Sequence, residues 1–312
     1  MNEKRLYKLT PSLHANIWGG NRLREYGKVS EADRIGESWE LSFVKGNEAY
    51  ADGVPISELL TKESFGTRAA SFEFFPVLTK FIDAKEKLSV QVHPGDEYAL
   101  ANEGMYGKSE MWYVVDAEEG AGLYMGFRRH VDGEELRGAI ESGTVESLLS
   151  FKPVKAGDVF FIPAGTVHAI GGGVLIYEIQ QNSTLTYRLY DYMRRDSTGG
   201  LRELHVEKAL SVLSPEPYSP MSFEGEGVIG RCEYFTTVLH KSADMPRTVT
   251  VDGGSFVSLT AVSGEGTLTY TEKNGKSTKI HLTRGDTYLA PASKCAFGIT
   301  LSGDMTVIEV RV

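Results

Sequence analysis

The chain has 312 residues, and 33 basic against 42 acidic side chains give a net charge of −9 with histidine neutral. That length fits one large domain or two modest ones, and an apolar content of 41% excludes a globally disordered chain. The acidic balance argues against binding to nucleic acid or to an anionic membrane, which both favour clustered lysine and arginine. Two cysteines, Cys232 and Cys295, are too few for a disulfide framework.

The opening residues MNEKRLYKLT contain no apolar stretch typical of a signal peptide. The longest apolar run, residues 159–179, is interrupted by Pro163, His168 and four glycines, so it does not predict a membrane span. We therefore expect a cytoplasmic protein, a monomer or homodimer, with no membrane and no nucleic-acid partner.

Strand patterns dominate the chain. Runs rich in β-branched and aromatic residues, bounded by glycine, proline or aspartate, predict strands at Phe75–Ile82, Leu88–His93, Met111–Val115, Val159–Pro163 and Val174–Gln180. Beyond Arg231 the predicted strands follow closely at Tyr234–His240, Thr248–Val251, Phe256–Val262, Thr267–Glu272, Lys279–Leu282, Thr287–Pro291 and Met305–Val310. Short strands at this spacing predict a mainly β fold, either a sandwich or a closed jelly roll.

Helical patterns are few and short. Asp132 is a candidate cap for a helix in the segment 130–150, which also holds a second short helical pattern from Val145 to Leu149. A third helix is predicted at Glu203–Leu213, ahead of Pro215. Residues 214–227, rich in proline and glycine, are the candidate linker.

One internal repeat organises the chain. GDVFFIPAGTVH at Gly157–His168 returns as GDTYLAPASKCA at Gly285–Ala296, a gapless offset of 285 − 157 = 128 residues. Two copies of a β unit predict two barrels: a first domain at residues 1–220 with the helical insertions, and a second at residues 221–312. Since His168 corresponds to Ala296, only the first copy is expected to carry a functional histidine.

The segment QVHP places two polar side chains on one strand face. Gln91 and His93 point the same way because strand side chains alternate, and burying them costs free energy unless a metal or a hydrogen-bond network satisfies them. Glu110 opens the next strand and would complete a divalent-metal set with His168. Glu97 competes with Glu110, but its position predicts a first-turn acid of a short helix, so Glu110 is preferred.

The Gly157–His168 stretch resembles the second motif of the cupin superfamily. Together with QVHP, KSEMW (Lys108–Trp112) and YEIQQNSTLTYRLYDY (Tyr177–Tyr192), it makes the chain similar to the class I mannose-6-phosphate isomerases, in their short bacterial form. WGG at residues 18–20 and IGESWELS at residues 35–42 are similar to that family's opening. The resemblance spans most of the chain and is weakest after about Ser214.

The resemblance implies two cupin jelly-roll barrels and one Zn²⁺ per chain, with other divalent metals left open. Its zinc ligands fall on Gln91, His93, Glu110 and His168, and its further active-site residues on Lys108, Glu178 and Arg188. It implies an isomerase that interconverts mannose 6-phosphate and fructose 6-phosphate by proton transfer through an enediol(ate).

Each of the three further residues has an expected role. Glu178 is the candidate base, on the expectation that burial near the metal raises its basicity. Lys108 would shuttle the oxygen proton or bind substrate, and the planar fork of Arg188 suits phosphate or the enediolate.

The chain departs from the family pattern at several positions. Thr184 and Gly107 stand where long-form members have an aspartate and many members have a histidine, so neither of those groups is essential if the reaction is the same. Gln91 and Gly172 replace the usual cupin histidine and asparagine, the former as in the isomerase family. Three alternatives stay open: a metal-dependent cupin oxygenase, a non-catalytic sugar-phosphate-binding cupin, and an isomerase for another aldose.

Overall fold

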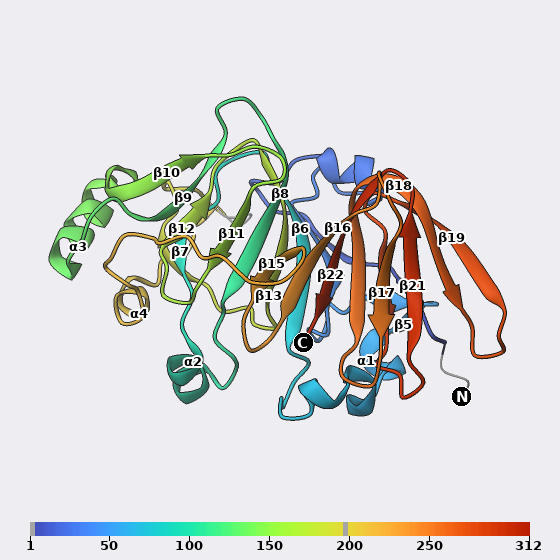
Figure 1. Cartoon of the computed structure of the whole chain (residues 1–312). Helices are drawn as coiled ribbons and strands as arrows, with labels where there is room; N and C mark the ends of the chain where they lie inside the picture. The colour runs from blue at the N-terminus through green and yellow to red at the C-terminus, as the bar shows by residue number, and fades with distance from the viewer. Residues whose placement is uncertain (1–3, 196–198) are drawn as a thin grey trace.

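The computed structural model describes residues 4–195 and 199–312 and shows a mainly β protein with three large sheets in succession (Figure 1). The five-stranded sheet has the order β10 (Leu149–Pro153), β9 (Gly122–Phe127), β12 (His168–Ile170), β7 (Val90–Val92), β14 (Tyr187–Tyr190). The six-stranded sheet has the order β11 (Val159–Ile162), β8 (Glu110–Ala117), β13 (Val174–Gln181), β6 (Val77–Ala84), β3 (Glu37–Leu41), β2 (Ser12–His14).

The nine-stranded sheet is built mainly from the C-terminal part of the chain. Its main path is β1 (Tyr7–Leu9), β20 (Thr287–Ala290), β18 (Val257–Thr271), β22 (Met305–Arg311), β16 (Thr236–Lys241), β15 (Val228–Arg231). The long strand β18 also pairs with β19 (Ser277–Thr283) and β21 (Phe297–Ser302), and β21 pairs with β17 (Arg247–Val251). Because β1 pairs with β20 from the opposite end of the chain, the N-terminal segment forms one edge of this sheet.

The first two sheets face each other across a shared interior. Along β7, Val90 and Val92 lie in an apolar cluster with the helices on the outer side, so Gln91 and His93 point inward. The inner part of this interior is filled by an apolar cluster that includes Trp18, Ile82, Trp112, Leu123, Ile162 and Ile176. Polar side chains therefore gather in only one part of an otherwise apolar interior.

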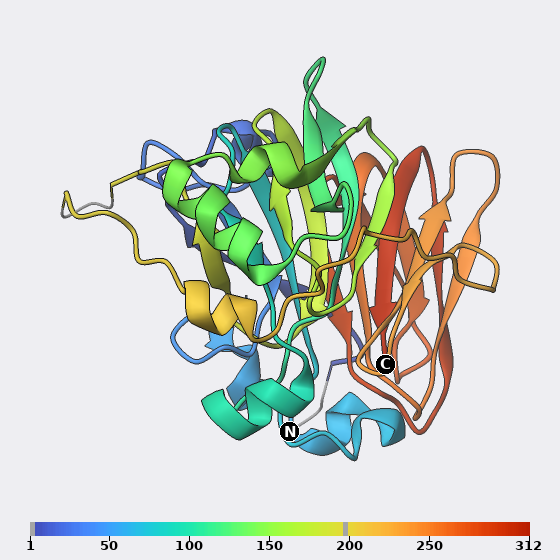
Figure 2. The same ribbon diagram turned by 90° about the vertical axis from the view of Figure 1, so that its left-hand side faces the viewer.

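Helices cover the outer face of the five-stranded sheet (Figure 2). They are α3 (Gly133–Ser142) and α4 (Val206–Leu210), and Leu136 and Ala209 from them pack against the valines of β7. The Asp132 side chain accepts a hydrogen bond from Glu135 N and caps α3 as expected. The remaining helices are α1 (Ile56–Leu59), α2 (Asp96–Glu103) and the 3-10 turns η1 (Arg22–Tyr26), η2 (Lys62–Phe65), η3 (Thr67–Ala69), η4 (Val145–Leu148), beside the hairpin β4 (Tyr50–Ala51) and β5 (Val54–Pro55).

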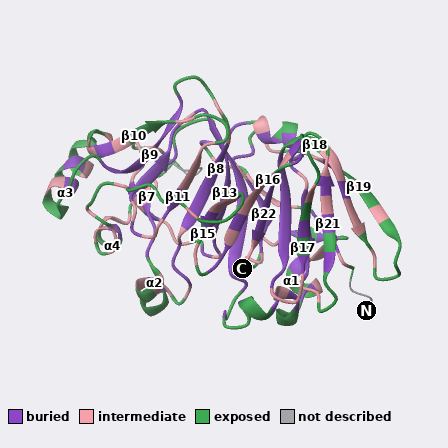
Figure 3. Cartoon of the chain, in the orientation of Figure 1, coloured by how far each residue is buried: buried purple, intermediate pink, exposed green. Residues whose placement is uncertain are grey.

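The six-stranded sheet packs its other face against the nine-stranded sheet. Phe81, Tyr177 and Ile179 on one side meet Phe235, Phe256 and Ile308 on the other in the largest buried cluster, and buried residues fill the centre of the molecule (Figure 3). The domain limits at residues 220 and 221 and the number of barrels stay predictions.

The internal repeat is visible in the backbone. Strand β11 at Val159–Ile162 and strand β20 at Thr287–Ala290 are offset by 287 − 159 = 128 residues, and the glycines before them both have a left-handed φ, 93° and 90°. The carboxylates that follow these glycines accept hydrogen bonds from the backbone N–H groups three residues earlier, at 2.9 and 3.1 Å. The two turns therefore have the same construction.

Several predicted elements have different limits in the structure. Residues 257–271 form one continuous strand where the pattern predicts two, and the predicted helix at Glu203–Leu213 is helical only at Val206–Leu210. The second pattern in 130–150 is a 3-10 turn that runs into β10, because Leu149 already pairs with Phe127 of β9. Short strands β12 and β14 were not predicted. Among the described residues, no helix has the length and apolar character required to cross a bilayer.

Candidate metal centre

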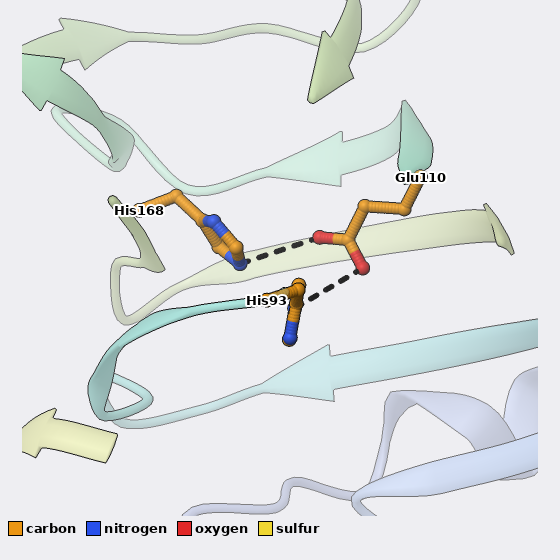
Figure 4. Close-up of side chains that lie close together, drawn as sticks. All are labelled: His93, Glu110 and His168. Carbon is orange, nitrogen blue, oxygen red and sulfur yellow. Dashed lines mark ion pairs between the residues drawn. The ribbon is translucent and has the colours of Figure 1, made fainter. Parts of the chain in front are cut away.

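Three metal-binding side chains meet in the interior between the first two sheets (Figure 4). His93, Glu110 and His168 each offer one ligand atom, and these atoms all lie within 4.8 Å of one another. Glu110 Oε2 is 3.5 Å from His93 Nε2, and its Oε1 is 3.3 Å from His168 Nε2. All three side chains are at most 1% exposed.

The sheets bring these residues together from distant parts of the chain. His93 follows β7, Glu110 opens β8, and His168 opens β12 directly after the turn at residues 163–167. His168 pairs in register with Gln91 of β7, and directly paired residues of antiparallel strands point to the same face. The predicted ligands therefore converge from both sheets.

The two imidazoles have defined tautomers. His93 Nδ1 donates to the Leu185 carbonyl at 2.8 Å, and His168 Nδ1 donates to the Thr166 carbonyl at 2.9 Å. Burial lowers the pKa of His168 to about 4, and burial followed by repulsion from Lys108 lowers the pKa of His93 well below its ordinary value. Both rings are thus neutral near pH 7 and turn the Nε2 lone pair toward the carboxylate.

The cluster leaves buried polar atoms without hydrogen-bond partners. His93 Nε2 and both carboxylate oxygens of Glu110 have no partner with hydrogen-bond geometry among the described residues, although the Lys108 ammonium lies 2.8 Å from Glu110 Oε2. Burial, followed by repulsion from Glu178, raises the pKa of Glu110 to about 7. Unsatisfied buried polar atoms are costly, so two imidazole nitrogens and a carboxylate aimed at one point fit a divalent metal such as zinc.

Gln91 lies beside this group. Its side-chain Nε2 is 3.3 Å from His168 Nε2, while its Oε1 lies 3.4 Å from Ser89 Oγ. The oxygen and nitrogen of an amide are assigned from the hydrogen-bond network. A flip of the Gln91 side-chain amide would place its oxygen, instead of its nitrogen, beside His168 Nε2. Glu97, the competing acid, is exposed in the first turn of α2 and outside the cluster.

A charged network adjoins the cluster on the six-stranded sheet. Lys108 Nζ is 3.9 Å from Glu178 Oε1, which is also 3.5 Å from Lys80 Nζ. The other oxygen of Glu178 accepts a hydrogen bond from Trp112 Nε1 at 2.9 Å. All these side chains are under 10% exposed, so Glu178 is a buried carboxylate held between two ammonium groups.

The expected rise in the basicity of Glu178 is wrong. Burial does raise its pKa, but the charges of Lys108 and Lys80 outweigh burial and bring the pKa below its ordinary value. Glu178 is therefore ionised at neutral pH. The carboxylates of Glu110 and Glu178 raise the pKa of Lys108 by more than its burial lowers it. The Lys108 ammonium therefore stays charged.

Arg188 approaches the cluster from the edge strand β14. It pairs in register with Gln91 and lies on the face opposite Tyr187 and Leu189, which belong to the outer apolar cluster. Its Nη1 donates to the Glu203 carbonyl at 3.1 Å, and its buried Nε has no hydrogen-bond partner in the described residues. The structure thus places all seven predicted site residues around one interior.

Sequence reasoning missed two charged residues of this interior. Lys80 and Glu37 lie 3.9 Å apart, and the Lys80 ammonium stacks 4.5 Å from the centre of the Trp39 ring. Every residue of β6 is buried, so no polar–apolar alternation marks Lys80 as inward-facing. The signal available in the sequence is a lone lysine inside an otherwise apolar strand, which needs a buried partner.

Comparison with known proteins decides the family. The model of the phosphomannose isomerase type I catalytic domain matches residues 6–121. A mannose-6-phosphate isomerase of Streptococcus mutans is 46% identical over 215 residues, which cover 66% of this chain and 67% of that protein. The crystal structure of the mannose 6-phosphate isomerase from Bacillus subtilis superposes with a TM-score of 0.86 at 32% identity and covers 99% of this chain and 100% of its own. The chain belongs to the mannose-6-phosphate isomerase family.

The mainly β, cupin-type fold predicted from the sequence is confirmed by the structure and by the mannose-6-phosphate isomerases that the chain resembles. A structure described as mannose 6-phosphate isomerase bound with zinc and yttrium has a TM-score of 0.75 at 17% identity and covers 98% of this chain and 99% of its own. That likeness is one of fold. Among the alternatives, family membership favours the isomerase over a cupin oxygenase or a non-catalytic cupin.

Proposed function

We propose that the chain is a metal-dependent isomerase that interconverts mannose 6-phosphate and fructose 6-phosphate. The observation that carries this proposal is the buried cluster of His93, Glu110 and His168, with unsatisfied ligand atoms, next to the ionised Glu178 and the Lys108 ammonium. Family membership supplies the substrate class. The substrate is a small sugar phosphate, and we place the protein in the cytoplasm as a monomer or homodimer.

The residues proposed to hold one zinc ion per chain are Gln91, His93, Glu110 and His168. Two neutral imidazoles, one carboxylate and an amide oxygen suit zinc, although manganese or iron would accept the same donors. When bound, the ion acts as a Lewis acid that stabilises negative charge developing on the sugar oxygens. A mannose 6-phosphate isomerase structure described as bound with zinc and yttrium has the same fold.

The reaction moves one proton between C1 and C2 of the sugar and another between O1 and O2. Glu178 is the proposed base for the carbon-bound proton, since its carboxylate is ionised, buried and aimed into the interior. Lys108 and Lys80 keep it ionised, and their charges also favour the enediolate over the neutral sugar.

Lys108 and Arg188 have the remaining roles. The Lys108 ammonium is the proposed donor of a proton to one sugar oxygen, and the neutral amine left behind would take up the proton released from the other oxygen; alternatively, the ammonium is a ligand for a sugar hydroxyl. Arg188 is the proposed ligand of the phosphate, because its buried Nε has no hydrogen-bond partner among the described residues and faces the same side of the sheet as Gln91.

A coupled assay tests this function. Formation of fructose 6-phosphate from mannose 6-phosphate is followed before chelation, after chelation and after zinc is added back. We expect loss of activity on chelation and its recovery with zinc. Full activity in the chelated protein would overturn the metal-dependent mechanism, and absence of isomerisation in the metal-loaded protein would overturn the function.

A further inference from the structure

A second group of charged residues follows Arg188 directly along the chain. Asp191, one residue beyond the end of β14, is 4% exposed. Its Oδ1 binds the Arg194 guanidinium, and its Oδ2 lies 3.0 Å from Arg202 Nη1. One buried carboxylate therefore binds both Arg194 and Arg202.

The Asp191–Arg202 pair is linked to Arg188 by the backbone that follows Arg202. Residues just after Arg202 run beside β14, where the Glu203 carbonyl accepts from Arg188 Nη1 at 3.1 Å. His205 Nδ1 accepts from the Arg188 backbone N–H at 3.1 Å, and the His205 N–H donates to the Arg188 carbonyl at 2.7 Å. The segment that Asp191 secures through Arg202 thus fixes both the backbone and the guanidinium of Arg188.

Arg194 attaches the same carboxylate to the neighbouring strand. Its Nη1 donates to the Lys87 carbonyl at 2.5 Å, a short distance before β7 and Gln91. Between Asp191 and Arg194, Tyr192 and Met193 have left-handed φ values of 54° and 56°, a strained conformation for two adjacent residues with side chains. A strained turn of this kind persists when contacts with the surrounding structure stabilise it. Asp191 supplies such contacts by binding Arg194 and Arg202.

The three arginines near Asp191 differ in their pairing. Arg194 and Arg202 both pair with the Asp191 carboxylate, whereas Arg188 makes no ion pair with any described residue and keeps an unsatisfied Nε. In a chain with a net charge of −9, a guanidinium without an ion-pair partner among the described residues is suited to an anionic ligand.

We infer that Asp191 is a positioning residue: by binding Arg194 and Arg202 it leaves Arg188 oriented and unpaired, ready to bind the phosphate of the substrate. This inference rests on the proposed function, because Arg188 is the proposed phosphate ligand. It adds a residue that does not touch substrate and acts through the Arg202–Glu203 segment.

The test compares Asp191→Asn with Asp83→Asn. Asp83 is a matched control, since it is a buried carboxylate that binds the Arg22 backbone N–H and guanidinium, both at 2.8 Å, on the outer side of β6. For Asp191→Asn we expect the KM for mannose 6-phosphate to rise about tenfold, with kcat changed less than about threefold, as for loss of uniform substrate binding. Asp83→Asn should lower the melting temperature and leave KM unchanged.

Arg202→Gln keeps the inference falsifiable if Asp191→Asn does not fold. It removes one arm of the Asp191 pair, so KM should rise about threefold at constant kcat. Calorimetric titration with inorganic phosphate gives a second readout, and its Kd should rise in parallel in both variants. Wild-type KM and phosphate Kd in a folded variant would overturn the inference. A different result would overturn the proposed function alone: the wild-type protein does not isomerise the sugar, yet its phosphate Kd rises when Asp191 is replaced.

Discussion

The two interiors of this molecule share a glycine–aspartate turn and the strand that follows it, and they differ in what fills them. Between the first two sheets, the turn after β11 leads to His168, which is fully buried beside Glu110. In the C-terminal sheet, the turn after β20 leads to Ala296, which is exposed, and the interior beside it is a continuous apolar cluster that includes Leu259, Leu268, Leu282, Ile299 and Val307.

The two copies have the same local backbone but different buried side chains. Strands β11 and β20, their preceding glycines and their capping aspartates correspond residue by residue. One copy nevertheless keeps unsatisfied polar atoms that a metal would satisfy, and the other buries hydrocarbon that stabilises the fold. We therefore expect changes in the first interior to affect activity, and changes in the second to affect stability.

Removing a proposed ligand has the largest expected effect. His168→Ala should abolish metal retention and lower kcat/KM by at least about a thousandfold, because the Lewis acid contributes several kcal/mol to the barrier. Metal analysis and the coupled assay check this. Cys295→Ala, in the turn of the second copy, is the control and should keep both metal and activity. Equal losses in the two variants would show that the two copies do not differ in the proposed way.

Removing the proposed base has the next largest effect. Glu178→Gln should lower kcat by about 10²- to 10⁴-fold, the usual contribution of a general base, with bound metal unchanged. Exchange of the C2 proton of mannose 6-phosphate with solvent, followed by NMR, should fall with kcat. Retention of wild-type exchange would assign the base role to another residue.

Loading the first interior with zinc should stabilise the protein. Because the ligand atoms of His93 and Glu110 are unsatisfied without an ion, binding favours the folded state by about 4 kcal/mol at a free zinc concentration a thousand times the Kd. Thermal unfolding with and without zinc measures this. The His168→Ala variant should show little of the stabilisation, and an equal gain in that variant would place the zinc elsewhere.

Truncating the second interior should reduce stability without changing the chemistry. Leu259 is fully buried, and Leu259→Ala is expected to lower the free energy of unfolding by about 2–5 kcal/mol through loss of burial and a residual cavity. Denaturant unfolding measures the change. Folded Leu259→Ala should bind one metal and keep its KM; a large rise in KM would mean that the two interiors are coupled.

Restoring the missing histidine should have the smallest effect. Ala296→His supplies an imidazole where the second copy has none, but the position is exposed and the adjoining interior cluster is apolar. The variant should bind no additional metal. A second bound ion would show that one residue alone distinguishes the two copies.

The sequence predicted the parts of the molecule that depend on local patterns. Strand β11 begins at the expected residue because the repeated glycine, aspartate and proline bound it on both sides. The separation of His93, Glu110 and His168 along the chain carries no information about their proximity. Their convergence was expected only from the resemblance to a known family.

Other features depend on contacts that no local pattern encodes. The pairing of β1 with β20 joins residues nearly a chain length apart. Lys80 gives no alternation signal because both faces of β6 are buried. The lowered pKa of Glu178 follows from Lys80 as well as Lys108, so the sign of the shift could not be predicted while Lys80 was missing. The Asp191 pairs likewise need the return of the chain at Arg202.

The most direct test of the account is a zinc titration of the chelated wild-type protein, with isomerase activity measured at each addition. We predict that activity rises linearly from near zero and stops rising at one equivalent of zinc per chain. Activity that is independent of added zinc, or that needs two equivalents, would contradict a single metal centre at His93, Glu110 and His168.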